Sequence, residues 1–196
     1  GAGMEIFQPS GNMVIDVGGG TTDIAVLSMG SIVTAESIKM AGDKFDIAIQ
    51  QYIKNKYKLL IGERTSEDIK VNIATVFPGG RNEEIDIPGR AMVSGLPRTI
   101  TVYSHEVEEA LREPVSLITE SAKNVLEKTP PELSADIIDR GIMLTGGGAM
   151  IHGLDQLLAE ELMVPVFLAE EPMNCVATGT GILLENMDRM VRKNVI

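Results

Sequence analysis

The sequence has no tryptophan, one cysteine, two histidines and only 4% aromatic residues in a chain of 196. Its single cysteine, Cys175, excludes an internal disulfide and is typical of proteins in a reducing compartment. The histidines, His105 and His152, are far apart and do not have the spacing of a zinc site. No apolar run reaches the ~20 residues that a membrane-spanning helix needs.

Positive charge is also scarce. The chain carries 17 Lys and Arg against 28 Asp and Glu, a net charge of −11. This balance argues against a nucleic-acid partner, because nucleic-acid phosphates require a basic surface. Hydrophobic residues make up 44% of the chain and charged residues 23%, which is typical of a globular protein with one good core or two small lobes.

The most informative stretch present is an apolar strand, a glycine turn and a second apolar strand. Residues 13–17 are apolar except for Asp16, and Gly18-Gly19-Gly20-Thr21-Thr22 follows before the chain turns apolar again at 24–27. A glycine turn can direct several N–H groups at one phosphate, and Asp16 could hold a hydrated Mg²⁺ beside it. The same pattern also fits a plain β-hairpin that binds nothing.

Two further features strengthen the interpretation as a binding site. Gly146-Gly147-Gly148 follows a predicted strand at 141–145 and leads into Ala149-Met150. Flat glycine backbone can lie against a base or ribose, although a tight strand-to-helix turn would look the same. Glu67 and Lys70 share one helix face, where they could hold ribose and base or form an ordinary solvated ion pair.

The order of the predicted elements indicates an α/β protein with an inserted smaller subdomain at residues 42–102. We expect an antiparallel meander of three strands at 13–17, 24–27 and 31–38. Helices are predicted at 43–62, 65–76, 105–128, 154–162 and 174–190, with Pro114 kinking or dividing the long one. Residues 83–103 are β-like, and 141–145 and 164–168 are expected to be strands, the latter buried.

Together these motifs resemble the MreB/Mbl family of bacterial actin homologues. Asp16 to Thr22 resembles the second phosphate loop of the family, Thr145 to Met150 its adenosine loop, and Glu67 with Lys70 its adenosine-contacting pair. The resemblance runs from residue 10 to 188, with further matches at 41–46, 60–63, 130–133 and 139–141. Each motif is shared with actins, Hsp70 proteins and sugar kinases, but the combination is specific to MreB-like proteins.

The resemblance implies an actin-like (ribonuclease H-like) ATPase fold, a mixed sheet flanked by helices with an inserted α+β subdomain. The core would comprise residues 1–41 and 103–196, and the insertion residues 42–102. It further implies that the chain is the carboxy-terminal half of its parent, with its last residues packing toward the first lobe. Three elements of the family would then lie upstream of this chain: the first phosphate loop, the acid that positions water, and the elements that touch the membrane. Gly1-Ala-Gly3 would be the end of a preceding helix or a cloning remnant.

By the same resemblance, the parent binds ATP and Mg²⁺ and assembles with itself into cytoplasmic filaments at the inner face of the cell membrane. Those filaments maintain rod shape together with the cell-wall elongation machinery. The implied ligand contacts are Gly18, Gly19, Gly20, Thr21 and Thr22 with phosphates, Asp16 with Mg²⁺ through water, Glu67 and Lys70 with ribose and adenine, and Gly146, Gly147, Gly148, Ala149 and Met150 with the base. No catalytic residue and negligible hydrolysis are expected in this chain alone. The alternatives are another ATPase of the superfamily and a non-catalytic filament module.

Overall fold

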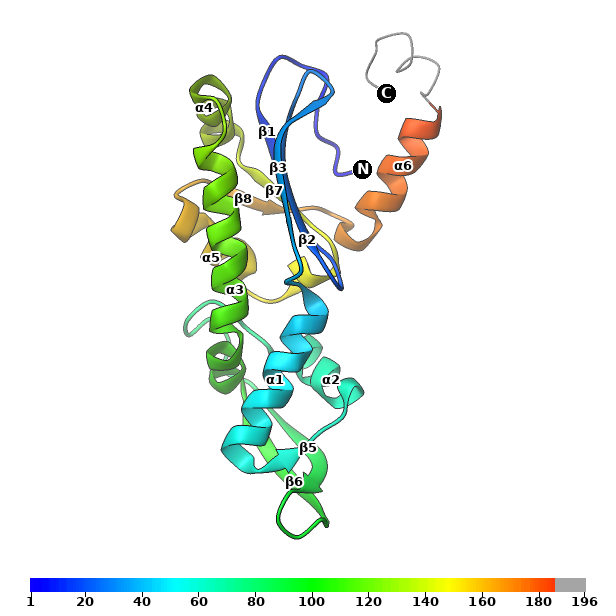
Figure 1. The fold of residues 1–196 in the computed structure, drawn as a ribbon, viewed down its shortest axis with the longest axis vertical. Helices are drawn as coiled ribbons and strands as arrows, with labels where there is room; N and C mark the ends of the chain where they lie inside the picture. Colours follow the sequence, from blue (N-terminus) through cyan, green and yellow to red (C-terminus); the bar gives the residue numbers. More distant parts are fainter. Residues whose placement is uncertain (186–196) are drawn as a thin grey trace.

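The computed structural model describes residues 1–185 and is elongated, with one sheet in its upper half and a smaller one at its lower end (Figure 1). Its helices and strands are β1 (Asn12–Val17), β2 (Thr22–Ser28), β3 (Ser31–Ile38), α1 (Gly42–Tyr57), β4 (Leu59–Leu60), α2 (Glu63–Ile73), β5 (Glu84–Ala91), β6 (Pro97–Tyr103), α3 (Ser104–Glu127), α4 (Pro131–Arg140), β7 (Ile142–Thr145), α5 (Leu154–Leu162), β8 (Val166–Leu168) and α6 (Cys175–Glu185). Short 3₁₀ helices occupy Gly147–Met150 and Pro172–Asn174.

The upper sheet is mixed, as expected. Its strand order is β3-β2-β1-β7-β8. Strands β1, β2 and β3 form the predicted antiparallel meander, whereas β7 runs parallel to both β1 and β8. Alternate residues of β1 (Met13, Ile15 and Val17) are completely buried, so this strand lies at the centre of the core.

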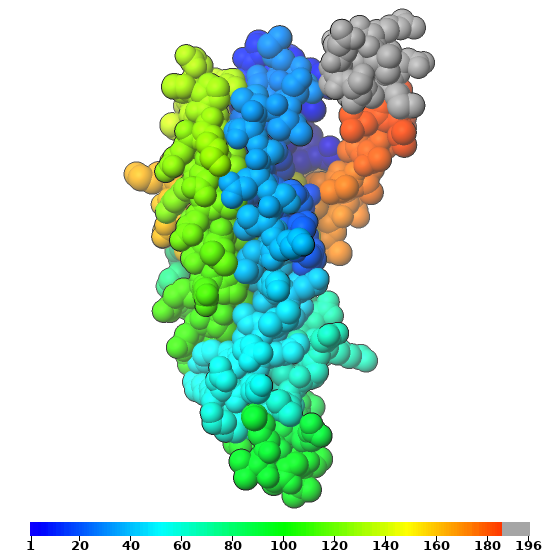
Figure 2. Space-filling model, in the orientation of Figure 1, coloured from blue at the N-terminus to red at the C-terminus, as the bar shows by residue number. Residues whose placement is uncertain are grey.

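Helix α3 is the longest element and runs beside α1 along the body (Figures 1 and 2). The apolar positions that predicted this helix all face the core: Val107, Leu111, Val115, Ile118, Ala122 and Val125. Of the two effects predicted for Pro114, a kink or a division, the division is wrong, because α3 continues through this residue as one helix.

A buried acid joins α1 to α3. Glu106, whose side chain is 1% exposed, accepts hydrogen bonds from Lys56 Nζ (2.6 Å) and the Tyr57 hydroxyl (2.6 Å). It also accepts from the backbone N–H of Tyr103 at 2.9 Å, which caps the first turn of α3. The carboxylate therefore links the end of one helix to the start of the other.

The lower sheet is antiparallel, in the order β4-β5-β6, and ends in the β5–β6 hairpin at the narrow tip of the molecule (Figure 2). The predicted extension of the first helix to residue 62 is wrong, because Lys58 takes a left-handed conformation with φ of 52° and ends α1. Leu59 and Leu60 then pair with β5. At the hairpin tip Met92, Val93 and Leu96 are exposed, Val93 to 94%.

Other differences concern the carboxy-terminal third. Helix α4 was not predicted from the sequence; it has Pro131 in its first turn and ends at Gly141, where φ is +83°. The strand expected to be buried is the edge strand β8, so Phe167 remains 53% exposed. The last predicted helix is present as α6, and its expected end at residue 190 lies outside the described residues. Among residues 1–185, no helix is both long and apolar enough to span a membrane.

Candidate functional site

The two glycine turns meet because β1 and β7 are parallel neighbours. Their register pairs Asp16 with Thr145, so the two strands end at the same level of the sheet. In open α/β sheets, ligands bind beyond the carboxyl ends of such strands. The turn after β1 and the turn after β7 accordingly lie at one edge.

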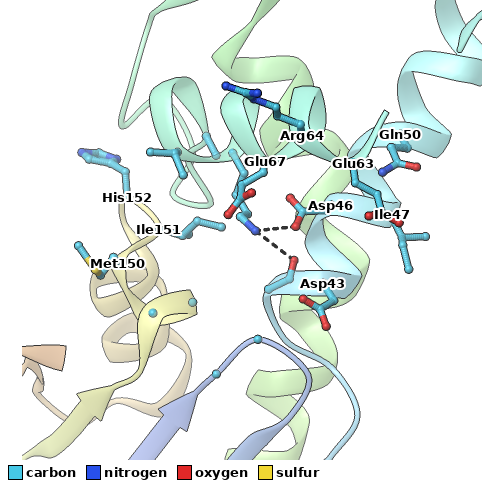
Figure 3. Close-up of a pocket in the computed structure, with 18 of the residues that line it drawn as sticks. Asp43, Asp46, Ile47, Gln50, Glu63, Arg64, Glu67, Met150, Ile151 and His152 are labelled. Atoms are coloured by element: carbon cyan, nitrogen blue, oxygen red, sulfur yellow. Dashed lines mark hydrogen bonds and ion pairs between the residues drawn. The ribbon is translucent and has the colours of Figure 1, made fainter. Parts of the chain in front are cut away.

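An open cleft of about 1330 Å³ lies above this edge, with α1 and α2 as its opposite wall. Figure 3 shows Met150, Ile151 and His152 on one side and Asp43 and Asp46 on the other, with Glu67 above the gap. Of the predicted site residues, the cleft is lined by Gly18, Gly19, Glu67, Lys70, Gly147, Gly148 and Met150. It is not lined by Asp16, Gly20, Thr21, Thr22, Gly146 or Ala149.

The first glycine turn caps helix α1. The carbonyls of Gly18 and Gly19 accept hydrogen bonds from the N–H groups of Gly42 (3.1 Å) and Asp43 (2.8 Å). These are among the first helical N–H groups, which have no partner within the helix itself. Within residues 1–185, no acceptor occupies the N–H groups of Gly19 and Gly20, so both can serve an anion.

The two threonines of this turn point elsewhere. Thr22 is completely buried, and its hydroxyl donates to the carbonyl of Met40 at 2.5 Å. The hydroxyl of Thr21 donates to Asp23 at 3.0 Å. Neither hydroxyl is directed to the cleft in this structure.

The second glycine turn is shaped mainly by its contact with β1. Gly146 has φ of +89°, and a Cβ there would lie 2.3 Å from the carbonyl oxygen of Val17. A Cβ at Gly148 would lie 2.6 Å from the Val17 side chain. At Gly147 the nearest atom would be Met173 Cγ at 3.7 Å, an ordinary contact. Only Gly147 therefore has an open face that a planar ligand group can approach.

Asp16 lies beneath the second turn, since its Oδ1 would be 2.5 Å from a Cβ at Gly146. Burial raises the pKa of Asp16, and Asp23, its partner across the β1–β2 pair, raises it further. A hydrogen bond from Thr145 acts in the opposite direction. The part of the chain that the structure describes has no group of three or more acids, histidines or cysteines placed to hold a metal ion. A single carboxylate such as that of Asp16 is compatible with a Mg²⁺ ion that keeps several of its waters.

Lys70 is paired with Asp46 and not with Glu67. Its ammonium donates to Asp46 Oδ2 at 2.7 Å and to the carbonyl of Gly42 at 3.3 Å, as the dashed lines in Figure 3 show. Both side chains of this ion pair are 16% exposed. Burial raises the pKa of Asp46, and the contacts with Lys70 oppose that rise. The exposed carboxylate of Glu67 is free to face the cleft.

Several lining residues were missed from the sequence. Asp43 and Asp46 belong to a stretch interpreted there as a helix start and a family match but not as part of the site, and Arg64, Arg81 and His152 stood in no motif. No spacing links these five residues, because they come from four separate segments. His152 is fixed by Thr75, whose hydroxyl lies 3.1 Å from its Nδ1.

Comparison with known proteins agrees with the geometry. The family model of the MreB/Mbl protein matches residues 1–192. The cell shape-determining protein Mbl of Bacillus subtilis (strain 168) is 72% identical over 195 residues, which is 100% of this chain and 59% of that protein. MreB of Escherichia coli (strain K12) is 46% identical over 188 residues, covering 96% of this chain and 54% of that protein. The chain thus spans little more than half the length of these relatives.

Solved structures confirm the actin-like fold. MreB5 of Spiroplasma citri bound to ADP superposes with a TM-score of 0.93 at 39% identity, over 97% of this chain and 58% of that one. A structure of the same protein bound to AMPPNP gives the same TM-score, 0.93. MamK in its double helical filament is 24% identical and superposes with a TM-score of 0.69, over 83% of this chain and 50% of that one. This similarity supports only the fold.

Proposed function

The chain belongs to the MreB/Mbl family of cell shape-determining, actin-like proteins, and from this premise we propose that it forms one wall of an ATP-binding cleft. The observation that carries the proposal is the convergence of both glycine turns, Glu67 and Lys70 on one cavity. Its volume of about 1330 Å³ is ample for a nucleotide, since ligand pockets usually measure roughly 300–1,000 Å³. The nucleotides bound by the Spiroplasma citri relative support this choice of ligand.

In the proposed complex, the N–H groups of Gly19 and Gly20 hold phosphate oxygens. Asp16 would contact Mg²⁺ through its bound water. Lys70 and Glu67 contact the ribose and adenine from α2, and Gly147 and Met150 lie against the base from the opposite side. ATP with Mg²⁺ supplies a transferable γ-phosphoryl group, and the protein's part in such chemistry is positioning and charge stabilisation.

We expect the chain alone to bind nucleotide weakly and to hydrolyse it negligibly. In the proposed complex, only the turn after β1 contacts the phosphates, through the N–H groups of Gly19 and Gly20. The described residues also place four acids (Asp43, Asp46, Glu63 and Glu67) along the cleft against three strong cations (Arg64, Lys70 and Arg81). We propose that the remaining phosphate contacts come from the part of the longer relatives that this chain does not match.

At the level of the whole protein, we propose ATP-dependent filaments at the inner face of the membrane that act with the wall-synthesis machinery to maintain rod shape. The names of the Mbl and MreB relatives support a role in cell shape. Contacts between subunits are proposed for the exposed apolar hairpin tip, whose Val93 is 94% exposed. Large exposed apolar side chains grouped at one place favour protein association.

Titration calorimetry of the 196-residue chain with Mg·ADP and Mg·ATP tests the nucleotide site. We expect saturable binding in the millimolar range, weakened by Gly19→Ala. A Cβ at Gly19 would lie 3.6 Å from Asp43, so this change leaves the fold intact while obstructing the approach of a phosphate. Glu161→Gln, remote from the cleft, is the matched control and should bind as the unaltered chain does. Absence of saturable binding, or equal affinity in Gly19→Ala, would contradict the proposal.

A further inference from the structure

Asp46, an acid in the cleft wall, forms the one ion pair that Lys70 makes within residues 1–185. Asp46 lies on the first turns of α1, four residues after Gly42, and therefore on the same helix face as Gly42. The Lys70 ammonium bonds to the Asp46 carboxylate at 2.7 Å and to the Gly42 carbonyl at 3.3 Å. An ammonium has three donors, so two are occupied by α1 and one is left for the cleft.

Gly42 also contacts the phosphate end of the site. Its N–H donates to the carbonyl of Gly18 at 3.1 Å, and the next N–H, of Asp43, donates to Gly19 at 2.8 Å. One continuous set of contacts thus runs from α2 through Lys70 and the start of α1 to the glycine turn. Within residues 1–185, the second oxygen of Asp46, Oδ1, is buried and has no hydrogen-bond partner, so Lys70 is the group in this part of the chain that holds the carboxylate.

We propose that Asp46 is a positioning residue that aims the third donor of Lys70 into the cleft and keeps α2 in register with the glycine turn. The inference rests on the proposed nucleotide site, since Lys70 is the group that would touch the ligand. Asp46 itself acts through Lys70. Removing one partner of a buried ion pair leaves the other charge uncompensated, so without Asp46 we expect the Lys70 ammonium to leave this position for the solvent of the cleft.

The effect on Lys70 is measurable without any nucleotide. Acetic anhydride modifies solvent-accessible amines, and mass spectrometry follows the rate at each lysine. With the 196-residue chain, Asp46→Asn should raise the acetylation rate of Lys70 several-fold. Lys123 provides an internal control, because it forms an ion pair of the same length, 2.7 Å, with Glu161 far from the cleft. Its rate should rise in Glu161→Gln and stay constant in Asp46→Asn.

Nucleotide affinity is the second measurement. Asp46→Asn should weaken Mg·ADP binding about tenfold, the value of one charge-assisted hydrogen bond. Lys70→Met should weaken it by a similar factor, and the double variant should be no weaker than Lys70→Met, because the two residues act as one unit. Thermal unfolding of each variant verifies that the chain remains folded.

The outcomes separate this inference from the proposed function. An unchanged Lys70 acetylation rate in Asp46→Asn overturns the positioning role whether or not nucleotide binds. Additive losses in the double variant also overturn it. If Lys70 becomes reactive but the unaltered chain binds no nucleotide, the placement of Lys70 by Asp46 stands and the nucleotide proposal fails.

Discussion

In the glycine triplet after β7, mutation should show that Gly146 is required for folding and Gly147 for binding. Gly146 and Gly147 are adjacent, yet a side chain would meet different surroundings at each. At Gly146 the backbone has φ of 89° and ψ of 161°, a region essentially confined to glycine. At Gly147 an added Cβ has only ordinary van der Waals contact with Met173.

The cost of Gly146→Ala has two parts. Holding alanine at these dihedral angles costs about 1–3 kcal/mol. A Cβ placed 2.3 Å from the carbonyl oxygen of Val17 and 2.5 Å from Asp16 Oδ1 forces the strand and turn apart. Such overpacking typically costs a further ~1–3 kcal/mol. The free energy of unfolding should therefore fall by about 2–6 kcal/mol, whereas Gly147→Ala should change it by less than about 0.5 kcal/mol.

Urea unfolding followed by circular dichroism measures both changes, provided that the denaturant dependence (the m-value) stays constant between variants. In thermal unfolding each kcal/mol corresponds to about 2–4 °C for a chain of this size. Mg·ADP titration then completes the comparison, because Gly147→Ala should lose affinity while keeping its stability. A Gly146→Ala protein within about 0.5 kcal/mol of the unaltered chain would refute the reasoning.

Three further predictions concern single side chains. Asp16→Asn should raise the melting temperature at pH 7 while abolishing nucleotide binding. The pKa of Asp16 is raised, so its ionised carboxylate destabilises the fold as pH rises, and the gain in melting temperature should shrink toward pH 4. Glu106→Gln should cost about 2 kcal/mol in urea unfolding at pH 7. Burial alone would raise the pKa of Glu106, but hydrogen bonds from Lys56 and Tyr57 lower it overall, so this cost should disappear in acid as the unaltered carboxylate is protonated. Val93→Asp should leave the unfolding curve of this chain unchanged. The same substitution in a full-length relative should reduce the amount of protein that pellets with ATP, and unchanged pelleting would exclude the hairpin tip as a filament contact.

Local patterns in the sequence predicted much of the fold. The strand–turn–strand stretch around Gly18 and the apolar spacing along α3 are set by neighbouring residues, and both were correct. The errors occurred where distant contacts decide. Leu59 and Leu60 continue the apolar spacing of α1, but they leave the helix to pair with β5. An edge position likewise cannot be read from the apolar run that forms β8.

The candidate site was predictable in its motifs but not in the role of each residue. Gly146, Gly147 and Gly148 look equivalent in the sequence, although Gly146 and Gly148 serve contact with Val17 and Gly147 has only an ordinary contact with Met173. Glu67 and Lys70 have the spacing of an ion pair, yet Lys70 is held by Asp46 from another helix. Such assignments depend on the relative placement of α1, α2 and β1, which no spacing along the chain encodes.

That placement follows from a single register in the upper sheet. Asp16 at the end of β1 stands opposite Thr145 at the end of β7, where Thr145 is close enough to lower the pKa of the Asp16 carboxyl. A shift of one residue would exchange the buried and exposed faces of β7 and separate the two glycine turns. Gly146 lets the second turn lie directly on the end of β1, and the first turn caps α1, which carries Asp46 toward Lys70. The cleft is therefore a consequence of how the central strands pair, and substitutions at this pair should alter every wall of the site at once.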